Sequence, residues 1–524
     1  MKLPKPPKTA RNHPQCEYRG RSLFKVKMAV KQEHGLPKSA LRANALGLAD
    51  VLMQGITHTA PATAVLLTIQ FISSNAGVTA PLAYLVAFLI VLPLGVSLAQ
   101  LAKHFPSAGG YYTYVSRTVH PRAGFLTAWL YFLYSAVTPA FSLAMMGGVL
   151  ESSLKTEFGF VFPWWLFLLF GTGFTYWVTS RGIEISAKSL MILGAIEMGI
   201  VVLLAVWSLS DPGSGGVNVD SFNPSRAPSG GGFYLAVVFS IFALTGWEGV
   251  VPLAEESAHP RQIMPRAIMG TIIIMGGYLV FTSWGLLIGW GTNDVNNLVA
   301  SQEMPFFQLA KRFWGPGWIV ILFALLNSML AVAVATTLVS TRMWYAMARS
   351  GCLPESLARI HPGYKTPVRA IIFQSLVTLA VGPGLGFWIG PQQEYVLMGT
   401  VLTLALVLIY CAGNLGVFLH YRNHRRAEFQ PVLHAVFPLL SSVAVLWVGY
   451  KSVVPLPPAP VTYAPVIVAG WLALGVCVLA VMKWSGREQW LEKAGRVFEE
   501  TTGATGAPDP GRDQVGKTQR STAN

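Results

Sequence analysis

The chain has 524 residues, of which 53% are hydrophobic and only 12% are charged. Because roughly a quarter of the residues of a soluble domain are charged, this composition excludes an ordinary soluble fold and predicts a polytopic membrane protein. The formal net charge of +15 would suggest nucleic-acid binding in a soluble protein. Here the charge alternates between loops, which indicates membrane topology, and we expect no nucleic-acid partner.

Twelve apolar stretches are long enough to cross the lipid bilayer, since a helix needs roughly 17 to 25 residues to span the hydrocarbon. The predicted fold is therefore all-α, with twelve transmembrane helices. In chain order the stretches are 45–72, 82–101, 124–150, 163–179, 190–209, 233–253, 268–290, 315–341, 368–389, 395–420, 432–454 and 463–484.

The basic residues predict the orientation in the membrane. If both termini are cytoplasmic, 33 of the 38 Lys and Arg residues fall on that side. Cytoplasmic loops carry an excess of Lys and Arg, so we predict cytoplasmic termini, an even number of crossings and a multi-pass protein of the inner or plasma membrane. The basic residues left outside are Lys155, Arg226, Lys311, Arg312 and Lys451.

A Gly-, Ser- and Pro-rich loop, 211–232, separates the first ten stretches into two groups of five. The second group then starts on the opposite side of the membrane, as an inverted-topology repeat requires. The predicted division is a basic cytoplasmic segment (1–44), a first five-helix repeat (45–210), the external loop (211–232), a second repeat (233–420), helices 11 and 12 at the periphery, where homodimer contacts would fall (421–484), and a cytoplasmic tail with a disordered end (485–524).

The first stretch contains residues that interrupt a helix near the middle of the membrane. Gly55 permits unusual backbone angles, and Pro61 lacks an N–H and kinks a helix interior. Between them lie Thr57, His58 and Thr59. Opening the helix here would expose N–H groups that suit a carboxylate. The alternative is a proline kink whose threonine hydroxyls bond back to the backbone.

The sixth stretch has a matching interruption at Thr245, Gly246, Trp247 and Glu248. An acid inside an apolar helix is costly, so Glu248 is expected to face a cavity or a partner. Alternatively it is structural, protonated or bonded to a neighbouring helix end. Two interrupted helices in corresponding halves of a membrane chain predict a solute site at mid-membrane depth.

Three buried ionisable residues are candidates for proton coupling: His58, Glu197 and Glu248. For His58, bonding to an opened backbone carbonyl is an equally good interpretation. No metal-ligand spacing accompanies these residues, and the sequence has no HExxH motif, nucleophile elbow or phosphate loop. We therefore expect no metal, no cofactor and no enzymatic activity.

Three segments resemble a known family. They are FPSAGGYYTYVSR (105–117), FALTGWEGVVPLAEESAHPRQIMPRAI (242–268) and TRMWYAMARSGCLPESLARIHPGYKTPVRA (341–370). The chain resembles the amino acid-polyamine-organocation superfamily of secondary transporters. The resemblance implies the LeuT-type fold of two inverted five-helix repeats plus two helices, with Trp247 at the position of an aromatic gate. It also implies that Asn327, Ser328 and Tyr134 lie near the cavity.

The residues expected to bind substrate come mainly from the two interruptions. Relatives that take α-amino acids often have a Gly-x-Gly stretch where this chain reads QGITHTAPA, a pattern closer to putrescine- and amine-importing relatives. Some proton-coupled relatives have a lysine about where this chain has Glu197. The expected site residues are Ile56, Thr57, His58, Thr59, Ala60, Ala243, Leu244, Thr245, Gly246, Trp247, Glu248 and Asn327.

The predicted function is secondary active transport of an amino acid or small organic amine by alternating access, as proton-coupled uptake. Exchange of one amine or amino acid for another and import of a polyamine are alternatives within this class. A membrane nutrient sensor that binds without transporting is the alternative from another class. The expected partners are the substrate, protons and the lipid bilayer.

Overall fold

A computed structural model describes residues 41–301, 303–451, 453–486, 488, 490 and 494, and only the backbone of residues 183–187 and 189. All of them belong to the unit that begins at Ser39. The predicted segments 1–44 and 485–524 therefore lie largely outside the described residues.

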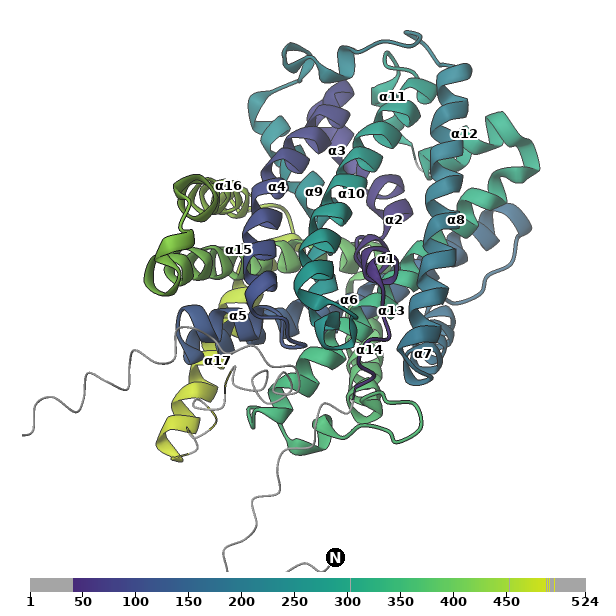
Figure 1. Ribbon diagram of the computed structural model, residues 1–524. Coiled ribbons are helices and arrows are strands. Elements are labelled where there is room, and N and C mark those ends of the chain that lie inside the picture. Colours follow the sequence, from purple (N-terminus) through teal and green to yellow (C-terminus); the bar gives the residue numbers. More distant parts are fainter. Residues whose placement is uncertain are drawn as a thin grey trace, which may run out of the picture. The chain divides into compact units, whose positions relative to one another are not determined.

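The described chain is all-helical and contains no β-strand (Figure 1). Besides short 3₁₀ turns it contains one longer 3₁₀ helix, η4, at Trp247–Glu256. The α-helices are α1 Leu48–His58, α2 Pro61–Leu66, α3 Thr68–Ala76, α4 Ala80–His104, α5 Tyr111–Thr118, α6 Pro121–Phe158, α7 Trp164–Ser180, α8 Ile183–Ser210, α9 Gly230–Leu244, α10 Pro260–Trp290, α11 Val295–Ala300, α12 Pro305–Trp314, α13 Ile319–Arg349, α14 Val368–Ile389, α15 Pro391–His424, α16 Phe437–Lys451 and α17 Ala464–Trp484.

Ten helical segments of the described chain are long and apolar enough to cross a membrane. Two of the twelve predicted stretches are not separate members of this set, for a physical reason in each case. Stretch 45–72 is broken into α1, α2 and α3, and α3 continues into α4. Stretch 163–179 forms α7, whose 17 residues reach only the lower limit for crossing the hydrocarbon. The all-α polytopic fold is confirmed, and the count of twelve stays a prediction.

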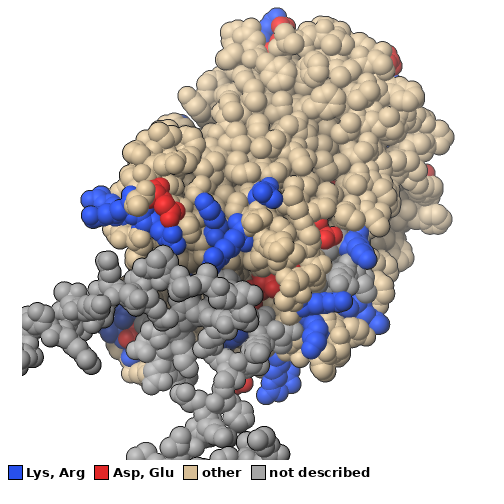
Figure 2. Space-filling model, viewed as in Figure 1, with Lys and Arg blue, Asp and Glu red and all other residues tan. Residues whose placement is uncertain are grey.

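Large apolar side chains cover the outward faces of these helices. Phe170 of α7, Phe387 of α14 and Val466 of α17 are each more than 60% exposed. On the face shown in Figure 2, charged side chains leave a broad area free, and many Lys and Arg residues gather along its lower margin. Apolar surface of this extent is suited to contact with lipid hydrocarbon.

The interrupted helix α1 lies in the interior of this unit. It packs against α8, α10, α13 and η4, and Figure 1 shows α1 and α2 beside α10 and α13. In contrast, α17 buries little besides Ala464, Val468 and Gly475. It is held to α6 by Trp129 and Trp471, whose indole N–H groups each donate to the other residue's carbonyl, at 2.8 and 2.7 Å.

The start of α1 and the end of η4 are joined by a set of contacts that we call the clasp. The Ala45 and Leu46 N–H groups donate to the Glu256 carbonyl at 2.8 and 3.1 Å, and the Ala258 N–H donates to the Leu46 carbonyl at 3.0 Å. The Glu256 carboxylate accepts from Arg342 of α13 at 2.7 Å, and both side chains are fully buried. The clasp thus ties together the ends of both interrupted spans and α13.

Candidate functional site

The first helix break lies between α1 and α2. α1 ends at His58, Thr59 caps it, and Ala60 adopts the left-handed conformation with φ 55°. Pro61 then begins α2, because its fixed φ suits a first helical position and its missing N–H is not needed there. Thr57 remains helical, so the break is shorter than the sequence suggested and comprises residues 59–60.

The second break lies between α9 and η4. Thr245 is extended and Gly246 has φ 114°, a conformation that favours glycine. A Cβ on Gly246 would lie 2.6 Å from the His58 carbonyl oxygen. The two breaks therefore touch each other, and Gly246 permits the contact.

The His58 imidazole fills a notch in η4. A Cβ on Gly249 would lie 1.7 Å from His58 Nδ1, so glycine leaves room for the ring. On its other side, His58 Nε2 lies 3.2 Å from the Tyr134 hydroxyl of α6. The imidazole is thus fixed between the two interrupted spans and α6.

Glu248 organises the start of η4. Its Oε2 accepts hydrogen bonds from the Gly246 N–H at 3.1 Å and from the Tyr410 hydroxyl of α15 at 3.2 Å. Its Oε1 has no hydrogen-bond partner among the described residues. The buried carboxylate therefore accepts from the opened backbone with Oε2, and the Tyr134 hydroxyl of α6 also faces it.

Trp247 is 1% exposed and its ring stacks on Tyr410, with ring centroids 5.6 Å apart and an angle of 24° between the planes. It does not line the cavity described below. A gating role for Trp247 would require the ring to leave this stack.

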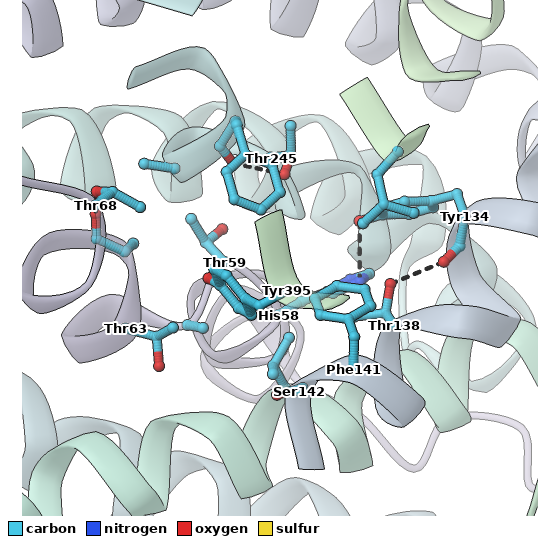
Figure 3. Close-up of a pocket in the computed structure, with 16 residues that line it drawn as sticks. His58, Thr59, Thr63, Thr68, Tyr134, Thr138, Phe141, Ser142, Thr245 and Tyr395 are labelled. Carbon is cyan, nitrogen blue, oxygen red and sulfur yellow. Dashed lines mark hydrogen bonds between the residues drawn. The ribbon is translucent and has the colours of Figure 1, made fainter. Parts of the chain in front are cut away.

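A cavity of about 50 Å³ lies at the level of both breaks. Figure 3 shows His58 and Tyr134 joined by their hydrogen bond beside it, with Phe141 and Tyr395 also on its wall. Its lining residues come from α1 to α3, α6, α9, α13 and α15: His58, Thr59, Ala60, Thr63, Ala64, Thr68, Tyr134, Thr138, Phe141, Ser142, Phe242, Ala243, Thr245, Val332, Tyr395 and Leu402.

The structure divides the predicted substrate residues into two groups. The group that lines the cavity is His58, Thr59, Ala60, Ala243 and Thr245. The group that lies outside its lining is Ile56, Thr57, Leu244, Gly246, Trp247, Glu248 and Asn327.

Thr57 illustrates why neighbours in sequence separate in space. Its hydroxyl donates to the Met53 carbonyl at 2.7 Å, and its methyl group meets Gly194 of α8. One step along a helix turns the side chain by about 100°, so Thr57 faces α8 while His58 faces the cavity.

Several cavity residues were not among the predicted ones. In α6, Thr138, Phe141 and Ser142 share a face with Tyr134, at offsets of four, seven and eight residues. This helical spacing of polar and aromatic residues in an apolar span is the sequence pattern that points to them. Tyr395 of α15 carries no comparable pattern.

Glu197 lies behind the break, on α8. Its Oε2 accepts a hydrogen bond from Asn327 Nδ2 of α13 at 2.6 Å. The Ser328 hydroxyl and the Ala62 N–H also face this carboxylate, and the Thr63 N–H donates to the Ser328 hydroxyl at 3.2 Å. Glu197 therefore interacts with the first turn of α2 and not with the cavity directly.

Within the parts of the chain that the structure describes, no three His, Cys, Asp or Glu side chains come together to hold a metal ion. The polar groups at the breaks instead suit an organic solute with hydrogen-bonding or charged groups.

A multi-pass membrane protein with two touching helix breaks and a cavity between them has the architecture of a solute transporter. The amino acid permease family model matches residues 50–486, and the chain belongs to this family. The resemblance to the amino acid-polyamine-organocation superfamily is thereby confirmed, as is a role in membrane transport.

Similar proteins differ in what their names say they carry. The low-affinity putrescine importer PlaP of Escherichia coli (strain K12) is 23% identical over 463 residues, which cover 84% of this chain and 94% of the relative. The serine/threonine exchanger SteT of Bacillus subtilis (strain 168) is 25% identical over 317 residues, covering 57% and 66%. The methylthioribose transporter of the same organism is 23% identical over 478 residues, covering 87% and 97%.

Proposed function

We propose that this protein is a secondary active transporter that moves a small organic amine or amino acid across the plasma membrane by alternating access, in proton-coupled uptake. The observation that carries the proposal is the cavity bounded by both helix breaks. Unwound backbone at membrane depth persists where it lines such a cavity. The relatives named above include an importer of an amine and an exchanger of amino acids.

The first turn of α2 favours an amine over an α-amino acid. In transporters of this architecture, N–H groups at a half-helix start receive the substrate carboxylate. Here Pro61 has no N–H, the Ala62 N–H faces Glu197, and the Thr63 N–H donates to Ser328. Because these groups are occupied by the protein itself, a substrate with an ammonium group and no carboxylate fits best.

The polar wall of the cavity offers acceptors for an ammonium group. The Tyr134 and Thr138 hydroxyls line it, and Glu248 lies behind Tyr134. A cavity of about 50 Å³ has room for ordered water, and most of the side chains that line it are buried. Substrate entry therefore requires the walls to separate, as alternating access demands.

Proton coupling is assigned to the three ionisable residues nearest the breaks. Glu197 joins α8, α13 and the start of α2, so a change in its protonation would alter contacts of the opened segment. Glu248 would bond the substrate ammonium through its free oxygen or through Tyr134, and His58 would relay a proton.

The proposed topology has twelve spans, with 45–210 and 233–420 as inverted repeats and 421–484 as two peripheral helices. The breaks support this division, because α1 and α9 each open one of the two groups. The proposal includes cytoplasmic termini and homodimer contacts through the peripheral helices.

The decisive experiment is uptake of radiolabelled putrescine and of serine into proteoliposomes with an imposed proton gradient. Glu248→Gln should reduce uptake roughly 10- to 100-fold, since hydrogen bonds to charged groups contribute about 1.5 to 3 kcal/mol. Glu303→Gln, at an exposed acid far from the breaks in sequence, is the matched control and should transport normally. Normal uptake by a well-folded Glu248→Gln protein would show that the proposed site is wrong.

The same vesicles distinguish the alternatives. Net uptake into empty vesicles indicates import, whereas uptake only into preloaded vesicles indicates exchange. Ligand-dependent thermal stabilisation without any flux would instead indicate a sensor.

A further inference from the structure

Glu394, in the first turn of α15, is fully buried and lacks a partner. Neither carboxylate oxygen has a hydrogen-bond partner among the residues that the structure describes. None of the ion pairs in this part of the chain includes it. The start of α15 favours a negative charge only modestly, so an ionised carboxylate buried here without a partner is unfavourable.

The other three fully buried acids of the described chain differ from it. Glu256 pairs with Arg342, Glu197 accepts from Asn327, and Glu248 accepts from Tyr410. Each of these carboxylates has at least one partner within the protein. The ligand that satisfies Glu394 must therefore come from outside the described chain.

The position of Glu394 links it to the cavity. The next residue, Tyr395, lines the cavity, and its ring meets Phe141 of α6 edge to face at 5.5 Å (Figure 3). Pro391, on the same face of α15 as Glu394, packs against Gly148 of α6. Tyr410 lies 16 residues further along α15, about 24 Å away at 1.5 Å per residue. Glu394 thus neighbours a residue that lines the cavity and lies well away along α15 from the Glu248 network.

We infer that Glu394 is a proton-binding site, which holds a proton while the Pro391 end of α15 is packed against α6. A proton needs only the carboxylate itself. An ammonium group would need several acceptors, and the buried side chains one turn further along α15, Leu397 and Met398, are apolar. A neutral acid is therefore the species that fits this environment.

The titratable and charged groups on neighbouring elements have other contacts. On α6, Glu151 accepts from the Trp164 N–H at 3.1 Å. On α16, Lys451 lies over the Trp447 ring, and in the turn before α17 Tyr463 stacks on Trp388. On α15 itself the neighbour is Tyr395, and the nearby Tyr84 hydroxyl of α4 is hydrogen-bonded to the Thr68 hydroxyl at 2.6 Å. None of them forms an ion pair or hydrogen bond with Glu394 in the described structure.

Proton binding here would couple to movement of α15. Separation of α15 from α6 at Pro391 admits water, and the carboxyl group then releases its proton as the carboxylate; repacking requires a proton to be taken up again. The assignment of the proton rests on burial and the missing partner, whereas its use in transport rests on the proposed function.

Infrared difference spectroscopy of the purified protein at neutral pH tests the assignment without any transport assay. The carbonyl-stretch band of protonated carboxyl groups should lose one component in Glu394→Gln, which has the shape of the protonated acid and so should fold, and should be unchanged in the exposed control Glu303→Gln. If Glu394→Gln does not fold, Glu394→Asp provides the test through a shift of that component. An unchanged band in the folded variant overturns the inference.

A second experiment tests whether Glu394 binds a proton or an amine. Titration with putrescine should leave the Glu394 component in place, whereas its disappearance on saturation would show that Glu394 binds the ammonium instead and would overturn the inference. In proteoliposomes, Glu394→Gln should flatten the dependence of uptake on external pH while substrate exchange continues. Loss of the infrared component together with an unaltered pH dependence would retain the proton site but separate it from transport.

Discussion

Gly249 shows how one missing side chain shapes the site. The His58 imidazole occupies the space that a Cβ at Gly249 would need, and this position aligns Nε2 with the Tyr134 hydroxyl. The end of α1 and the start of η4 therefore fit together closely, and the fit depends on the absence of a Cβ atom at Gly249.

Gly249→Ala should displace the imidazole and weaken its hydrogen bond to Tyr134. We expect uptake to fall at least tenfold and stability to fall by about 1 to 3 kcal/mol, the usual cost of overpacking a buried site. Thermal unfolding and proteoliposome uptake measure the two effects. Gly199→Ala on α8 is the control, because a Cβ there meets no atom within 4 Å; equal behaviour of the two variants would contradict the notch.

The sequence could predict where the chain breaks but not which side chains would meet there. Pro61 and Gly246 have strong local effects on the backbone, so the breaks fall close to the predicted positions. The rotation of an apolar helix about its axis is set by packing. When a helix is apolar on all sides, its sequence does not indicate which face points towards the cavity. The sequence therefore did not show that Thr57 faces α8 or that Tyr395 lines the cavity.

At the scale of elements, the buried pair Arg342 and Glu256 joins α13 to the end of η4. A second ion pair joins Arg349 to Glu255, and its Nη2 and Oε1 atoms lie 2.6 Å apart. These contacts hold together helices that are distant in sequence. Neither ion pair was predicted. The sequence shows which residues are charged, but it does not show which charged residues of distant helices will be buried together.

Arg342→Met should destabilise the protein by about 3 to 5 kcal/mol, because it leaves the Glu256 carboxylate buried without its charge partner. The double variant Arg342→Met, Glu256→Leu should recover much of this loss. Denaturant titration of the detergent-solubilised protein provides the measurement. Arg425→Met, which removes an exposed pair with Glu428, should change stability little, and a similar loss in both single variants would argue against a special role for the buried pair.

At the scale of the whole molecule, the all-α membrane fold followed from composition and apolar length alone. Twelve predicted stretches correspond to ten long helices because stretch 45–72 is broken into α1, α2 and α3, and because α7 has only 17 residues. The number of crossings is nevertheless a property of the complete chain, and it decides on which side each loop lies.

Reporter fusions test the crossing number. A reporter that is active only in the cytoplasm should be active at residue 1 and at residue 524, and inactive when inserted into loop 211–232. The physical reason is the placement of 33 of 38 basic residues on one side under an even count. Opposite results at the two termini would require an odd number of crossings.

The clasp has a consequence for speed. Three main-chain hydrogen bonds and the Arg342 ion pair lie side by side where the start of α1 meets the end of η4, so any movement that separates these segments from one another and from α13 breaks them nearly together. Such a step has a high activation enthalpy, and turnover should slow sharply on cooling while affinity, set elsewhere, hardly alters. At low temperature the protein would therefore still bind its substrate but would transport it very slowly.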